Sequence, residues 1–170
     1  MFRLRNIFAI VLMSCVLISC KFYSFTGADI DYNTTKTFQV NYFRNEAPLV
    51  EPSISRDFTD ALQELMLNQT SLSQTNRDGD LIFEGEIIEY YISPITATAE
   101  HRAAQNRLTI AVNVRFINKV NPEKDFERRF SYYHDYEGSA MLVGPQLSTA
   151  TEEIFERITQ DIFNASLANW

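Results

Sequence analysis

The sequence has few residues that could build a disulfide or a metal centre. Its 170 residues include two cysteines, Cys15 and Cys20, and two histidines. Both cysteines lie in the first 20 residues, so the remainder can form no disulfide and no cysteine-based zinc site. Neither histidine has a cysteine or a second histidine near it in the sequence. The chain is long enough to fold on a hydrophobic core alone.

Catalytic motifs are also lacking. No Gly-x-Ser-x-Gly, His-Glu-x-x-His, phosphate-binding loop or dinucleotide fingerprint occurs. His134 and Asp135 are adjacent, but neighbours on a strand point to opposite faces, so we interpret them as a surface polar pair. Glu84 and Glu86 share one strand face, which is usually the solvated side. We therefore expect neither an enzyme nor a cofactor; an enzyme would need His134 and Glu84 to converge.

Positive charge is scarce. The net charge is −7, and it becomes −9 without Arg3 and Arg5 near the start. This balance argues against nucleic acid as a partner and against adhesion to anionic lipid by charge alone. Internal repeats, proline- or serine-rich linkers and low-complexity tracts are absent, so we expect one domain after the N-terminal segment.

The longest apolar run at the N-terminus, 7–18, is too short for a permanent span of roughly 20 residues. It follows Arg3 and Arg5, as in a secretory signal peptide. The run ends in a tetrapeptide that resembles a bacterial lipobox, Leu17-Ile18-Ser19-Cys20. We expect residues 1–19 to be removed and Cys20 to carry lipid, including palmitate. An ordinary signal peptide is one alternative, and a lipobox ending at Cys15 is another, which would leave a shorter apolar run.

Hydrophobic periodicity predicts an α+β fold for residues 37–170, after a lead-in over 20–36. Alternation at period 2 predicts strands, and apolar residues at i, i+4, i+7 predict helices. The fold class is a two-layer sandwich: a small, mainly antiparallel sheet with two helices on one face, in the order β-α-β-β-β-α. The predicted elements are strand 37–43, helix 53–68, strand 81–92, strand 108–116, strand 126–134 and a helix from 149 onward.

Several local features qualify this prediction. Ser53 is a candidate N-cap, and Thr149 with Glu152 fits a capping box. Gly85 indicates a bulge or a close backbone approach. Residues 93–94, Ser-Pro, end the ladder or mark a sheet edge. Arg128 shares the parity of apolar neighbours, so either a bulge rotates it outward or its end of the strand faces solvent.

Four stretches are informative when taken together: the mature start CKFYSFTG at 20–27, GDLIFEG at 79–85, NRLTI at 106–110 and the C-terminal segment 161–170. They resemble the LptE-like family of lipopolysaccharide-assembly lipoproteins of the outer membrane. The similarity runs over essentially the whole mature chain in the same order. The resemblance implies a two-layer fold without reaction or cofactor, in agreement with the periodicity.

The resemblance also implies a partner, the large outer-membrane β-barrel LptD, whose lumen the lipoprotein plugs while it helps to insert lipopolysaccharide into the outer leaflet. An acidic run after Cys20, which directs some lipoproteins to the cell surface, is missing, so we expect the periplasmic side. Direct binding of lipopolysaccharide phosphate would need arginines, and the candidates are Arg102, Arg107, Arg115, Arg128 and Arg129. Alternatives are another outer-membrane adaptor, or a lipid-binding module with a cavity between Phe58/Leu62 and Phe83/Ile110.

Overall fold

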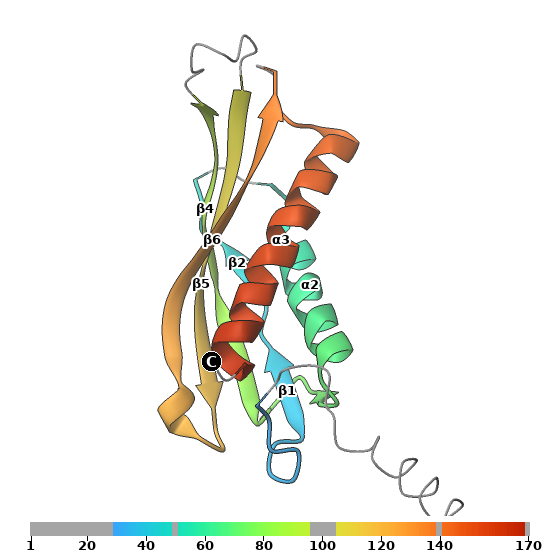
Figure 1. The fold of residues 1–170 in the computed structure, drawn as a ribbon, viewed down its shortest axis with the longest axis vertical. Helices are drawn as coiled ribbons and strands as arrows, with labels where there is room; N and C mark the ends of the chain where they lie inside the picture. Colours follow the sequence, from blue (N-terminus) through green and yellow to red (C-terminus); the bar gives the residue numbers. More distant parts are fainter. Residues whose placement is uncertain (1–28, 49–50, 96–104, 139–140, 169–170) are drawn as a thin grey trace, which may run out of the picture.

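The computed structural model describes residues 29–48, 51–95, 105–138 and 141–168. One sheet carries two helices on a single face, and three long strands form a curved ribbon that extends past the helices (Figure 1). The elements are β1 Thr37–Val40, β2 Arg44–Asn45, α2 Ile54–Gln69, β3 Ser73–Gln74, β4 Leu81–Ile95, β5 Gln105–Asn118, the 3₁₀ turn η2 Pro122–Lys124, β6 Phe126–Glu137 and α3 Gly144–Leu167. The predicted fold class is confirmed.

The ribbon β4-β5-β6 is antiparallel, and its alternating residues divide cleanly between two faces. Phe83 lies opposite Phe116 and Glu84 opposite Arg115 in the β4–β5 ladder. Phe83 and Phe116 are fully buried beneath the helices, whereas the Glu84 row faces away from them. The predicted alternation therefore sets one apolar and one polar face.

The sequence did not predict the parallel part of the sheet. The strand order is β3-β1-β4-β5-β6, and β2 also pairs with β4. β1 and β2 run parallel to β4, and β3 runs parallel to β1. A parallel pairing requires a crossover, and α2 provides it between β1 and β4. The predicted strand 37–43 breaks after Val40, so Tyr42 is exposed and Phe43 is buried instead.

Helix α2 starts where the periodicity predicted. Ser53 is its N-cap residue, although the Ser53 side chain makes no capping hydrogen bond. Phe58 is fully buried and makes edge-on contacts with Phe43, 5.0 Å between ring centroids, and with Phe155 of α3, 5.2 Å. Phe58 therefore ties α2 both to the sheet side and to the second helix.

Helix α3 begins earlier than predicted, so the capping box at Thr149 is wrong. The helix starts at Gly144 with Val143 as N-cap residue and a proline in its first turn. The Thr149 hydroxyl donates back to the Pro145 carbonyl oxygen at 3.1 Å, as mid-helix threonines do. Proline has no backbone N–H and therefore leaves no donor unpaired in the first turn, which lets the helix begin at Gly144, before Thr149.

Gly85 makes the close approach that the sequence indicated. A Cβ atom there would lie 2.0 Å from the Asn113 carbonyl oxygen and 2.9 Å from a ring carbon of Phe43. A bulge also occurs, but between Ile87 and Glu89. Pro94 does not end β4, which pairs with β5 as far as Ile95. No strand among the described residues covers its other side there, so the missing N–H costs no ladder bond.

Candidate functional site

The face of the sheet that the helices leave open carries three of the five candidate arginines. Arg107 and Arg115 come from β5, and Arg129 comes from β6. Their odd parity in these strands places them on the Glu84 side, opposite the core. Arg107 and Arg115 each lie beside a carboxylate of an adjacent strand, as opposite charges do in stabilising cross-strand pairs. Arg129 of β6 instead reaches across β5 to Glu89 of β4.

Arg107 has the most complete contacts of the three. Its Nε and Nη2 atoms donate to the two Asp135 carboxylate oxygens at 2.7 and 2.8 Å. Its guanidinium also lies 3.6 Å from the centroid of the Tyr133 ring. The hydrogen bond from Arg107 lowers the pKa of Asp135 below its ordinary value of 3.8, and the hydrogen bond to Asp135 raises the pKa of Arg107. The paired charges hold each other in the ionised form.

Arg115 and Arg129 are neutralised in the same way. Arg115 Nη1 lies 3.0 Å from Glu84 Oε1, and its Nε lies 3.6 Å from Glu127 Oε2. Arg129 Nη2 lies 2.8 Å from Glu89 Oε2. These three arginines of the polar sheet face are therefore all paired with carboxylates, although Glu84 and Glu127 share Arg115 and Glu86 accepts a hydrogen bond from the neutral Asn113 amide.

Arg128 differs from these three. It has core-side parity, yet the side chain is exposed at the outer strand of the sheet. Its guanidinium carbon lies 5.4 Å from the Phe126 ring centroid and 6.0 Å from that of Phe130. No bulge interrupts β5–β6 pairing, so the solvent-facing alternative is the correct one. The structure shows no carboxylate partner for Arg128 among its described residues.

Five predicted site residues lie outside the described part of the chain. They are the lipobox residues with the lipidation site, and one candidate arginine: Leu17, Ile18, Ser19, Cys20 and Arg102.

His134 and Glu84 do not converge. His134 has core-side parity and its Nδ1 lies 2.8 Å from Glu153 Oε2 of α3, whereas Glu84 belongs to the open face. Within the described ranges, no cluster of histidine, cysteine or acidic side chains is suited to holding a metal. The described helices also include none with the length and apolar content to cross a bilayer.

A lipid-binding module would need a cavity between the helices and the sheet. The four residues named for that cavity are fully buried in the core: Phe58, Leu62, Phe83 and Ile110.

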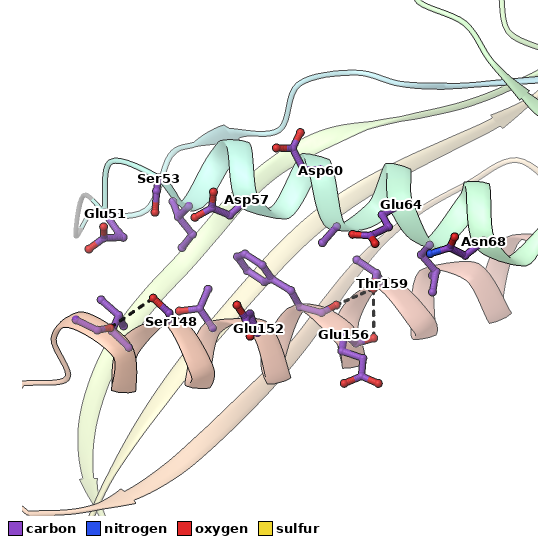
Figure 2. A pocket seen from close by; sticks show the side chains of 17 residues that line it. Glu51, Ser53, Asp57, Asp60, Glu64, Asn68, Ser148, Glu152, Glu156 and Thr159 are labelled. Carbon is purple, nitrogen blue, oxygen red and sulfur yellow. Dashed lines mark hydrogen bonds between the residues drawn. The ribbon is translucent and has the colours of Figure 1, made fainter.

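A groove of about 810 Å³ lies between the outer sides of the two helices, and sequence reasoning did not predict it. Figure 2 shows α2 and α3 side by side and running in the same direction, from Ser53 and Ser148 at one end to Asn68 and Thr159 at the other. Apolar side chains of both helices line its floor, and six carboxylates line its rim: Glu51, Asp57, Asp60, Glu64, Glu152 and Glu156. We call this feature the interhelical groove.

The sequence contained a signal for the groove. Asp57, Asp60 and Glu64 follow the i, i+3, i+7 spacing of one helical stripe, and Glu152 and Glu156 are four apart. The sequence alone assigns such stripes to a solvated helix face. The parallel arrangement of α2 and α3 brings the two acidic stripes to the same groove (Figure 2).

The chain matches a known protein family over most of its length. Residues 35–166 match the family model LptE, described as lipopolysaccharide-assembly. The chain belongs to the LptE family. The matched range contains all the strands and ends inside α3, so family membership covers the two-layer fold and not a fragment of it.

One solved structure shares the fold of this LptE-family chain at low sequence identity, and a second is similar over a comparable range. A rare lipoprotein B from Shewanella oneidensis aligns with a TM-score of 0.50 and 11% identity, over 75% of this chain and 92% of that one. A minor lipoprotein from Acinetobacter baumannii aligns with a TM-score of 0.47 and 13% identity, over 78% and 96%. No curated protein matches the chain in sequence.

Proposed function

We propose that this chain is a lipid-anchored outer-membrane component of the lipopolysaccharide assembly machinery. It is held on the periplasmic side through Cys20, fills the lumen of an LptD-like β-barrel, and helps to insert lipopolysaccharide into the outer leaflet. The family match over residues 35–166 carries this proposal. The signal-like N-terminus with its Leu17-Ile18-Ser19-Cys20 sequence supports the anchor.

The open sheet face is compatible with packing inside a barrel lumen. Three of its arginines are paired with carboxylates of other strands, so none of these three charges has to be desolvated without a partner. A polar wall can meet such a surface through hydrogen bonds and bridging water. The plug role thus depends on shape and polar contacts, not on catalysis.

The test is a pull-down of the tagged full-length protein from outer membranes in mild detergent. We expect one large β-barrel in near-equal amount, identified by mass spectrometry, and a lipid-modified Cys20. The matched control Cys20→Ser should lose the lipid and the membrane fraction. Recovery of the lipidated, folded protein without a barrel would overturn the plug role, and bound lipid in its place would favour a lipid-binding module.

Direct contact with lipopolysaccharide is a separate part of the proposal. Among the described candidate arginines, Arg107, Arg115 and Arg129 would have to exchange a carboxylate for a phosphate, whereas Arg128 already faces solvent without a carboxylate partner. Arg128 is therefore the first described residue to test, and Arg102 remains a candidate outside the described residues. We expect Arg128→Gln to weaken binding of purified lipopolysaccharide severalfold, with Arg56→Gln on α2 as the control. Equal binding by both variants would remove Arg128 from the proposal.

A further inference from the structure

The interhelical groove has the shape of a docking site for a third helix. Its lining residues on α2 extend from Ser53 to Asn68, which corresponds to about 22 Å of helix at a rise of 1.5 Å per residue. Ile54, Ala61 and Leu65 of α2 and Leu147 and Phe155 of α3 supply the apolar floor. A helix of about 15 residues matches that length, and ridges of an added helix pack into such a groove.

The charge on the groove has one sign. Six carboxylates and no basic side chain line it. Among them Asp57 has an ion-pair partner, with Arg56 Nη2 at 3.0 Å; for the other five the described residues provide no ion pair. Arg56 and Arg157 are the basic residues of α2 and α3, and Arg157 is positioned over the Tyr132 ring instead, 5.9 Å from its centroid.

The open sheet face shows that this protein neutralises acids elsewhere. Glu84, Glu89 and Asp135 each lie within 3.0 Å of an arginine nitrogen. Carboxylates left uncompensated around an apolar floor repel one another and create a negative potential along the groove. A partner that buries the floor and brings positive charge to both rims gains from both features.

We propose that the interhelical groove binds a cationic amphipathic helix of a partner protein. The apolar stripe of that helix covers the floor at Ala61 and Leu65. Its lysines and arginines flank the stripe, lay their aliphatic stems along the groove and place their charges beside Asp60, Glu64 and Glu156. The inference goes beyond the plug role and does not rest on it, because the groove is on the helix side and the recognition chemistry is its own.

The first experiment measures binding of a fluorescent 18-residue model peptide in which leucine and lysine follow a helical period. The full-length protein in mild detergent, at physiological salt, is compared with the variant Asp60→Asn/Glu64→Gln/Glu156→Gln. We expect the Kd of the variant for the peptide to be at least tenfold higher than that of the wild type. The matched control, Glu123→Gln/Glu137→Gln/Asp161→Asn, removes the same charge from exposed sites outside the groove and should change Kd less than twofold. Equal weakening by both variants would overturn the proposal.

A second variant tests the floor without changing charge. Ala61→Trp fills the groove, whereas Leu67→Trp adds the same side chain at an exposed position of α2 outside it. With circular dichroism showing both variants folded, we expect Ala61→Trp to weaken peptide binding at least tenfold and Leu67→Trp to leave it unchanged. Wild-type affinity in Ala61→Trp would overturn the proposal.

The natural occupant is tested with a photo-crosslinking residue at position 61 of the full-length protein in cells. Mass spectrometry should identify a lysine- or arginine-bearing helix of another protein as the crosslinked peptide. Crosslinking to lipid, to an extended segment or to a second copy of this chain would overturn the proposal. Loss of the barrel in the pull-down leaves these results unaffected, so the two proposals fail separately.

Discussion

The open sheet face and the interhelical groove are both rich in acidic side chains, but they treat charge in opposite ways. On the sheet, Glu84 and Asp135 each have an arginine on the neighbouring strand. On the helices, Asp60 and Glu64 are four residues apart and line the same groove as Glu156. Cross-strand registry puts unlike charges together here, while helical spacing puts like charges together. The number of acidic side chains alone therefore does not distinguish a surface whose charges are paired from one that is suited to a charged partner.

The largest loss of stability should come from a substitution in the core beneath the groove. Phe58→Ala removes a fully buried ring that contacts both Phe43 and Phe155. We expect a loss of about 3–5 kcal/mol in the free energy of unfolding, measured by urea denaturation. The exposed Leu67→Ala on the same helix should stay within about 0.5 kcal/mol of wild type. A small effect at Phe58 would mean that the helices hold the groove without this ring.

The sheet beneath both regions should be most sensitive at Gly85, which lies opposite Val114 in the core-side row of β4. Gly85→Ala places a Cβ atom against the Asn113 carbonyl oxygen, and this backbone cannot move without opening the β4–β5 ladder. We expect a loss of about 1–3 kcal/mol in unfolding free energy, and faster amide exchange in the β4–β5 ladder. Unchanged stability and exchange would show that the strands separate at little cost there.

The next largest effect on stability is expected on the open sheet face, and it should depend on pH. Arg107→Gln removes the partner that lowers the pKa of Asp135 below 3.8. A carboxyl group whose pKa is lowered on folding stabilises the folded state at pH values above its ordinary pKa, and this stability is lost as the pH falls through the folded-state pKa. The loss of unfolding free energy in Arg107→Gln should therefore be present at neutral pH and shrink below pH 3.8. Because the pair is exposed and screened by solvent, we expect this deficit in unfolding free energy to be small at pH 7. Urea denaturation at several pH values measures it, and a pH-independent deficit would contradict the assignment.

How far the sequence predicts these regions depends on the length of each element. Helix α2 and strands β4 to β6 show several periods of apolar spacing, and the two-layer fold follows from them. β2 and β3 have two residues each, too few for any period, so these two strands could not be predicted. β1 was predicted as a strand, but periodicity does not give its direction relative to β4. α3 was placed too late because Gly144 and Pro145 mark both loops and first helical turns.

The site was less predictable than the fold for a different reason. The arginines of the sheet face were identified by residue type, but their carboxylate partners depend on strand register, which single residues do not specify. The groove depends on the direction in which α3 runs beside α2. Asp57, Asp60 and Glu64 alone indicate only a solvated face; the second stripe, at Glu152 and Glu156, becomes informative once the helices are side by side.

The smallest predicted change in stability tests the difference between the groove and the open sheet face most directly. Neutralising the groove with Asp60→Asn/Glu64→Gln/Glu156→Gln should stabilise the free protein by about 0.5–1 kcal/mol at low salt, because each like-charge helical pair costs about 0.2–0.5 kcal/mol. The gain should shrink as salt screens the repulsion, since the Debye length falls to about 8 Å at physiological ionic strength. Urea denaturation at low and high salt measures both values.

The matched experiment on the sheet face should give the opposite sign. Glu84→Gln leaves Arg115, 3.0 Å away, with one carboxylate fewer, so stability should fall slightly instead of rising. Stabilisation in the groove and destabilisation on the sheet, from the same chemical change, would establish that the groove carries charge the free protein does not compensate. If both regions lose stability, the groove acids are compensated within the free protein, and its negative potential no longer argues for a cationic partner.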